Sequence, residues 1–142
     1  MESAIFTCPA AWEPLLPPGV RPLHRPGEAA GCWEVLALTP EGAALAEKAR
    51  CGLLLVPGDG RFSHVQACRV VTYGLSPRDT LTLSSLTEPV LCVQRALPRP
   101  DGDTIEPQEF PLPPLPFPAV ELLPLLGLRL LRMPLTEPPF SW

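Results

Sequence analysis

The stretch GLLLVPGDGRFSHVQACRVVTYG, residues 52–74, decides the fold of this chain. Its two apolar runs, LLLV and VV, are each followed by turn residues, which is typical of strands covered on both faces of a parallel sheet. The segment RFSHVQAC between them, residues 61–68, is expected to be a short connector with at most one helical turn. A succession of helix, strand, connector and strand predicts an α/β layer.

The helix of this layer is predicted directly upstream, over residues 39–50. Thr39 is placed to cap its first turn, and Pro40 suits the first helical position. Two strands are expected before the helix, at residues 4–8 and 32–38, because both segments are short and apolar. The upstream part of the chain therefore supplies one helix and two strands.

The sequence changes character in DTLTLSSL, residues 79–86, where leucines alternate with hydroxyl side chains. This alternation is typical of an antiparallel strand with one wet face. Residues 90–97 are expected to form the next strand, and the Asp-Gly step at 101–102 predicts a hairpin turn into a return strand over residues 104–112. Pro107 confines that return strand to an edge or a bulge. The middle of the chain thus predicts an antiparallel β-meander.

The last apolar segment, AVELLPLLGLRLLRM at residues 119–133, predicts a helix that is apolar on every side. A helix of this kind is buried on several sides or meets a partner. We therefore expect an α/β fold, with a small sheet that has a parallel part and an antiparallel β-meander, packed by two main helices. The 142 residues are expected to form a single domain, with an irregular proline-rich part at residues 1–31 and a tail at 134–142.

Composition and charge exclude several classes of protein. The formal charge of −4, without a run of Lys or Arg, argues against a nucleic-acid partner. Residues 119–133 are shorter than the roughly 20 residues of a membrane span, and they contain charged side chains. Five cysteines without a CxxC pair, in a chain whose first residues lack a signal-peptide pattern, predict reduced thiols in a cytoplasmic protein. His24 and His64 lack partners at metal-ligand spacing, so neither a metal nor a cofactor is expected.

Common catalytic motifs are also missing from the sequence. It contains neither a GxxxxGK[ST] P-loop nor a GxGxxG turn, and Ser84-Ser85 lacks the GxSxG elbow of a hydrolase. The PGDG segment at residues 57–60 is interpreted as a plain turn rather than a phosphate cradle, because Pro57 removes an amide donor and no lysine follows. No catalytic residue is assigned, and the chain is expected not to be an enzyme.

A polar corner is the remaining candidate site. Arg95 beside Gln94 could hold a carboxylate or a phosphate close to the row of hydroxyl side chains. The candidate ligand-binding residues are Tyr73, Thr82, Ser84, Gln94 and Arg95. The hydroxyl row has two interpretations, a ligand shelf and the solvated face of an antiparallel sheet, of which the second is the commoner arrangement.

The order of these segments resembles the second half of the Mur ligase central domain. There, a buried strand and its turn, a TYG strand, a β-meander and a helix follow one another. The corresponding segments here are residues 52–57, 71–74, 80–86 and 119–127. Mur ligases join amino acids to peptidoglycan precursors with ATP. The family's P-loop, metal-binding Glu and His, carbamylated Lys and carboxy-terminal ligase domain have no counterpart in this sequence, so no catalytic residue carries over.

The resemblance implies a non-catalytic cytoplasmic module for assembly or interaction, linked to cell-wall metabolism. Such a module would self-associate or bind a protein partner through the apolar helix at residues 119–133, because half of a parallel layer leaves strands unpaired. The alternative is a small-ligand protein or enzyme. It would bind a nucleotide or a UDP-linked precursor at the corner formed by Tyr73, Thr82, Gln94 and Arg95.

Overall fold

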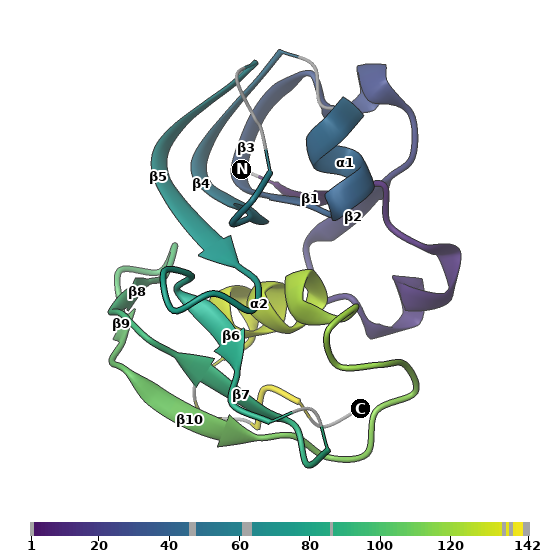
Figure 1. The fold of residues 1–142 in the computed structure, drawn as a ribbon. Helices are drawn as coiled ribbons and strands as arrows, with labels where there is room; N and C mark the ends of the chain where they lie inside the picture. Colours follow the sequence, from purple (N-terminus) through teal and green to yellow (C-terminus); the bar gives the residue numbers. More distant parts are fainter. Residues whose placement is uncertain are drawn as a thin grey trace.

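The computed structural model describes residues 2–45, 48–60, 64–85, 87–134, 136 and 138–140. Over these residues the chain forms an eight-stranded sheet in the order β10-β7-β6-β5-β4-β3-β1-β2 (Figure 1). Its strands are β1 (Ser3–Phe6), β2 (Val20–Leu23), β3 (Gly31–Leu38), β4 (Ala49–Pro57), β5 (Val65–Tyr73), β6 (Leu81–Leu83), β7 (Val90–Val93) and β10 (Gln108–Pro111). The other elements are the hairpin of β8 (Leu97–Pro98) and β9 (Thr104–Ile105), the helices α1 (Pro40–Leu45) and α2 (Leu123–Arg132), and the 3-10 turns η1 (Ala10–Leu15) and η2 (Pro26–Ala29).

The sheet is mixed, as predicted. Neighbouring strands from β2 across to β6 run parallel, whereas β7 is antiparallel to both β6 and β10. This confirms an α/β fold with a parallel part, an antiparallel part and two helices. The second half of β4, residues 53–57, forms an unbroken apolar run because it is covered on both faces.

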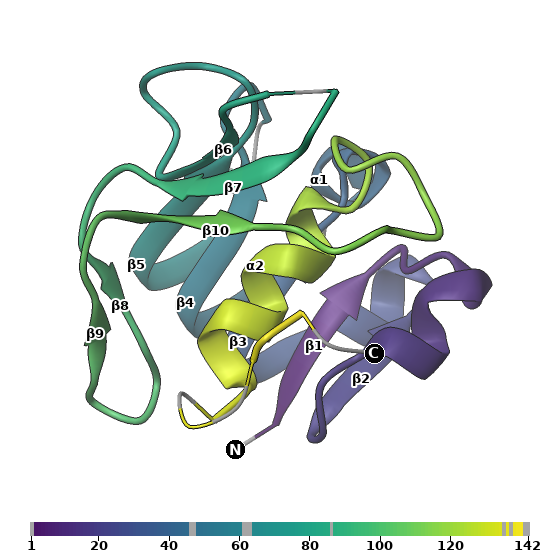
Figure 2. The same cartoon turned by 90° about the horizontal axis from the view of Figure 1, so that it is seen from below.

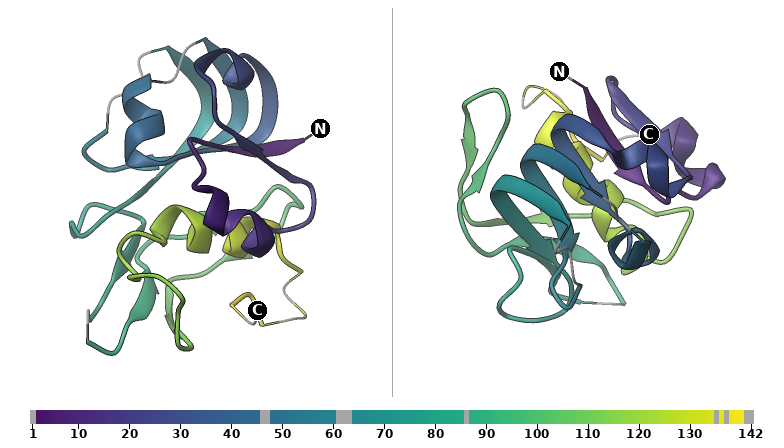
Figure 3. Two further views of the ribbon diagram at one scale, coloured as in Figure 1. Left: turned by 90° about the vertical axis from the view of Figure 1, so that its right-hand side faces the viewer. Right: turned by 90° about the horizontal axis from the view of Figure 1, so that it is seen from above.

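The two helices cover opposite faces of the sheet (Figures 2 and 3). Alternate residues of β1 divide between two cores, with Ile5 in the core beside α2, and Ala4 and Phe6 in the core beside α1. The helix α2 lies close to the sheet because Gly127 has no side chain. A Cβ at this position would lie 2.8 Å from the Cδ2 atom of Leu55. This close approach seals the larger of the two cores.

Arginine side chains tie α2 to the segments around it. Arg129 is only 5% exposed, and burial lowers the pKa of its guanidinium. Its Nε donates to the Pro139 carbonyl (2.6 Å), and its Nη1 donates to the Leu15 carbonyl (2.7 Å). Arg99, beside the β8–β9 turn, donates to the carbonyl of Leu130 near the carboxyl end of α2. The helix is thus held by the N-terminal segment, the hairpin and the C-terminal segment together.

The strands β3, β4 and β5 share a bend at one row of residues, Glu34, Gly52 and Cys68, which we call the bend row. Residues of the three strands are paired at the row Trp33–Cys51–Ala67 and again at the row Val35–Leu53–Arg69. The bend row between them has no pairs. The alternation of side chains changes phase there, because Cys51 and Leu54 both face the α1 core. The register offset is the same on both sides of the row, so the ladder is interrupted without an inserted residue. Figure 1 shows the strong curvature of β3–β5.

The first helix is shorter than predicted. It ends at Leu45, whereas the sequence pattern predicted a helix through residue 50. Ala49 and Arg50 instead begin β4, where they pair with Gly31 and Cys32 of β3. Pairing on both sides of β4 outweighs the helix propensity of this alanine-rich segment. Residues 46–47 lie outside the described part of the chain.

Strand boundaries also differ from the prediction at two places. The connector predicted at residues 61–68 is shorter, because β5 already begins at Val65; residues 61–63 lie outside the described part. The return strand predicted at 104–112 is divided into β9 and β10 on either side of Pro107, which supplies no amide hydrogen for a ladder. The first difference lengthens a strand of the main sheet, whereas the second leaves only β10 in that sheet and places β9 in a separate hairpin with β8.

The two ends of the chain are more ordered than the sequence predicted. Residues 1–31 were expected to be irregular apart from one strand, yet they contain β1 and β2. Pro22 lies within β2, and it is tolerated there because β2 is an edge strand. In the tail, Phe140 is buried and packs edge-on against Phe110, with 6.0 Å between the ring centroids. The predicted helix at 119–133 is confirmed in its central part, Leu123–Arg132.

Replacing Arg129 with methionine is expected to lower the free energy of unfolding by roughly 2–5 kcal/mol, because two carbonyls inside the fold lose a donor while the apolar stem is kept. Urea unfolding followed by circular dichroism measures this change. The matched control is Arg78→Met, since Arg78 is exposed, and its expected effect is within about 0.5 kcal/mol. Equal effects of the two substitutions would contradict the tethering role of Arg129.

Candidate functional site

The predicted polar corner is divided between the core and the surface. Tyr73 lies in the core beside α2, and its hydroxyl donates a 2.6 Å hydrogen bond to the Leu38 carbonyl at the end of β3. Burial, with a smaller contribution from the nearby Asp59 charge, raises the pKa of the Tyr73 phenol. The phenol therefore stays neutral and is engaged within the sheet.

Gln94 and Arg95 hold the loop that follows β5. The Nε2 of Gln94 donates to the carbonyls of Asp79 (2.6 Å) and Ser76 (3.3 Å). The Nη1 of Arg95 donates to the Arg78 carbonyl (2.6 Å). Both side chains donate to backbone oxygens within residues 74–80. Fewer of their N–H groups are therefore available to the predicted carboxylate or phosphate site.

Thr82 and Ser84 lie on the outer side of the antiparallel strands. Thr82 is paired with Cys92, which is in turn paired with Glu109, whereas the neighbouring Leu81 is fully buried on the opposite face. Ser84 is exposed just after β6, and its amide donates to Val90. The structure thus brings Gln94 and Arg95 together at one loop but does not gather the five predicted residues around one hollow. Their role as a ligand site stays a prediction.

The carboxyl ends of β4 and β5 enclose a hollow of about 410 Å³, lined by residues that include Asp59, Tyr73 and Asp79. Ligands of open α/β sheets commonly bind outside these strand ends. Here the carboxylate of Asp79, which is 4% exposed, occupies the space beside Gly58 and Gly74. A Cβ on Gly58 would fall 1.8 Å from Asp79 Oδ1, and one on Gly74 would fall 2.5 Å from Oδ2. A protein carboxylate thus takes the place that an anionic ligand would need.

The PGDG segment is a turn, as favoured from the sequence. The amide of Gly58 donates to the Tyr73 carbonyl (3.0 Å), and that of Gly60 donates to the Pro57 carbonyl (2.9 Å). Asp79 Oδ2 accepts a hydrogen bond from the Ser76 amide (3.1 Å). Because these amides already have acceptors, they do not form a cradle for phosphate.

The switch point of the sheet, where the strand order reverses between β1 and β3, is filled by protein side chains. The hydroxyls of Thr7 and Thr39 are hydrogen-bonded to each other across the two strand ends. Thr39 also donates to the Phe6 carbonyl (3.1 Å) and accepts from the Gly42 amide (3.2 Å). Gly42 is required there, since a Cβ would lie 2.7 Å from the Phe6 carbonyl oxygen. The usual ligand position at a switch point is therefore closed.

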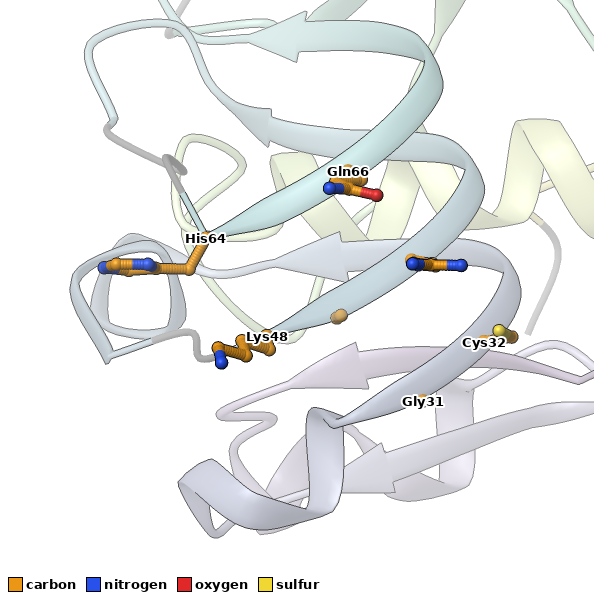
Figure 4. Close-up of a pocket in the computed structure, with 7 residues that line it drawn as sticks. Gly31, Cys32, Lys48, His64 and Gln66 are labelled. Carbon is orange, nitrogen blue, oxygen red and sulfur yellow. The ribbon is translucent and has the colours of Figure 1, made fainter.

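A hollow of about 500 Å³ lies at the opposite ends of the strands, where β3, β4 and β5 begin (Figure 4). Its polar side chains are Cys32, Lys48, Arg50, His64 and Gln66. Register places Cys32, Arg50 and Gln66 in one row across the three strands. This row lies on the amino side of the bend row, where the outer face is exposed. The described lining is cationic and contains neither Asp nor Glu.

Sequence reasoning missed this amino-end hollow. Arg50 was interpreted as a helix end and His64 as part of a connector. Their approach to each other depends on the parallel register of β4 and β5, in which Ala49 pairs with Val65. No spacing in the sequence signals that register.

A second feature of β5 is its open edge. The strand pairs with β4 along its whole length, from Val65 to Tyr73, but with β6 only at Tyr73. Figure 1 shows β5 as the outermost of the curved strands. Within the described part of the chain, residues 65–72 therefore have a partner strand on one side only. Val70 on this edge is 44% exposed.

The cysteines are free thiols, and two of them are shielded. Burial raises the pKa of both Cys8 and Cys51 to about 11, so these thiols are protonated and poorly nucleophilic near neutral pH. Cys51 packs in the α1 core, whereas Cys92 is only half-buried. Among the described residues, no three His, Cys, Asp or Glu side chains are grouped so that they could hold a metal ion. The described helices are all too short or too polar to cross a membrane.

Comparisons with known proteins add no family. A scan of family models and searches of curated proteins and of solved structures find no match to this chain. The function must therefore be inferred from the geometry described above.

Replacing Gly58 with alanine is expected to lower the free energy of unfolding by roughly 1–3 kcal/mol, because the added methyl group would overlap the Asp79 carboxylate. In an Asp79→Ala background the same substitution is expected to cost less than half as much, since the overlap is removed. Denaturant unfolding of the four proteins in this double-mutant cycle measures the coupling. Additive effects would contradict the packing of Asp79 against Gly58.

Proposed function

We propose that this chain is a non-catalytic assembly module that pairs with a second copy of itself through the open edge of β5. The observation that carries the proposal is the single-sided pairing of residues 65–72. A strand edge presents a row of unpaired N–H and C=O groups, and an added strand satisfies them. Residues 65–72 extend over roughly 26 Å at 3.3 Å per residue, which is a typical strand length.

The other edges of the sheet carry features that discourage pairing, and this edge does not. Pro22 lies in the edge strand β2, and Pro111 ends the edge strand β10. Proline and charge are common means of blocking a sheet edge. Residues 64–74 contain no proline, and Arg69 is their only Asp, Glu, Lys or Arg. The unprotected edge of β5 thus supports a specific pairing at this place.

A second copy is the occupant that fits this edge. Two identical edges related by a twofold axis pair in antiparallel fashion, and each satisfies the other without a further sequence requirement. Like charges do not oppose each other unless the axis passes through Arg69 itself. The exposed Val70 side chain would be covered in such a pair, which removes apolar surface from water.

The edge of β5 supports self-association better than the helix at residues 119–133. The side chains from Leu123 to Leu131 are buried within the chain itself. Of the large apolar side chains near this helix, Val120 remains 42% exposed. Self-association is therefore assigned to the edge of β5 and not to the helix at residues 119–133.

A Mur-ligase-like origin and a link to cell-wall metabolism belong to this proposal, and they rest on the resemblance of residues 52–57, 71–74, 80–86 and 119–127. The alternative ligand site at the polar corner has weaker support. The Tyr73 hydroxyl, the Gln94 amide and the Arg95 guanidinium all have protein acceptors. An assembly role uses the β5 edge, which is paired on one side only within the described residues.

Size-exclusion chromatography with light scattering tests the proposal. The unaltered protein is expected to have twice the 15.4 kDa mass of one chain. Val70→Lys is expected to give single chains, because a charge beside the edge opposes strand addition. Val120→Lys is the matched control, since Val120 has nearly the same exposure and lies near α2, and it is expected to leave the mass unchanged.

Three results would contradict the proposed assembly. They are a single-chain mass for the unaltered protein, an unchanged mass for Val70→Lys, and dissociation by Val120→Lys in place of Val70→Lys. Cys68→Lys provides a second variant on the same edge, because Cys68 is exposed. Circular dichroism of each variant establishes that it is folded before its mass is compared.

A further inference from the structure

We propose that the amino-end hollow binds a small molecule through a phosphate group. The hollow is formed where β3, β4 and β5 begin, and its volume of about 500 Å³ lies within the range of small-molecule sites. Lys48, just before β4, and Arg50, within it, contribute two basic side chains, and His64, just before β5, contributes ring nitrogens. This inference is independent of the proposed pairing of β5.

Among the described residues, the cations of the hollow have no ion-pair partner. Three other basic side chains are engaged in ion pairs: Arg21 with Glu2, Arg99 with Asp101 and Arg132 with Glu34. In the described part of the chain, Lys48 and Arg50 make neither an ion pair nor a side-chain hydrogen bond. Lys48 and Arg50 both line this hollow, so a bound anion would offset two like charges at once.

The donors suit phosphate in particular. The planar guanidinium of Arg50 can offer two parallel N–H donors to two phosphate oxygens, and Lys48 adds a compact positive charge. Gln66, which is paired with Arg50 across the sheet, adds an amide donor in the same row. The lack of Asp and Glu among the described lining residues removes the usual competitor for these donors.

A small phosphorylated molecule fits this hollow better than a nucleic acid does. Nucleic-acid binding requires an extended basic surface that neutralises several phosphates. Here the positive groups gather at one hollow in a protein whose formal charge is −4. A long polyanion would be repelled by the rest of the surface, whereas a single mono- or diphosphate group meets only the cationic lining.

Isothermal titration calorimetry with inorganic pyrophosphate as the probe tests the site on the full chain. Saturable binding is expected, and added sodium chloride should weaken it because the lining is exposed. Arg50→Gln and Lys48→Gln are each expected to weaken binding about tenfold, the loss of one charge-assisted contact. Arg78→Gln is the matched control: this exposed arginine lines the hollow at the opposite ends of the strands, so pyrophosphate binding should be unchanged.

Further ligands separate the sources of the phosphate. Tighter binding of ADP than of pyrophosphate would identify a nucleotide as the class of ligand, and equal binding would identify the phosphate group alone. Citrate that binds as tightly as pyrophosphate would overturn the assignment to phosphate. Failure of the unaltered protein to bind pyrophosphate at millimolar concentration would overturn the site, as would wild-type affinity in both Arg50→Gln and Lys48→Gln.

The proposed phosphate site and the proposed strand pairing are tested by different measurements, so either can be contradicted without the other. Loss of pyrophosphate binding in Arg50→Gln should leave the molecular mass unchanged, because Arg50 belongs to β4 and not to the open edge. Val70→Lys should change the mass and retain pyrophosphate binding, since Val70 lies beyond the bend row from the hollow. A single substitution that abolished both properties would contradict their independence.

Discussion

A helix that is apolar all the way round must be enclosed on every side, because exposing any of its faces to water costs free energy. The helix α2 is of this kind, with buried side chains from Leu123 to Leu131. The sheet covers one side, and the remaining sides are closed by segments distant in the sequence. The helix has little polar surface, so few hydrogen bonds hold it in place. Arg99 donates to the carbonyl of Leu130 within the helix. Arg129 of the helix donates to the carbonyls of Leu15 and Pro139.

This enclosure explains where the surface is left open. The covering segments gather around α2 and the carboxyl halves of β3–β5, where Tyr73, Asp79 and the Thr7–Thr39 pair close the strand ends. The amino halves bend away at the bend row and retain an exposed outer face. An α/β sheet usually carries its ligand site at the carboxyl ends of its strands. In this chain the open surfaces are at the other end and along the edge of β5.

The parts of the fold that depend on local pattern could be predicted from the sequence. The apolar run in residues 53–56, the alternation after Thr80 and the break at Pro107 each report a local property of the backbone. The candidate site could not be predicted in the same way. Lys48 and His64 line one hollow only through the register of two parallel strands. Gln94 and Arg95 bind loop carbonyls that no side-chain pattern reveals. Pro22 concealed β2, because a proline is compatible with a strand only at an edge.

The bond between Arg129 and Leu15 joins residues that are 114 positions apart. On the ribosome, the sheet therefore emerges well before the helix that covers it. Until residue 129 has left the exit tunnel, the apolar face formed by residues such as Ile5, Val35 and Leu55 has no cover. Nascent chains with exposed apolar surface and open strand edges are those that chaperones bind. The folding of the parallel strands is thus tied to the availability of α2, a segment made after every strand of the sheet.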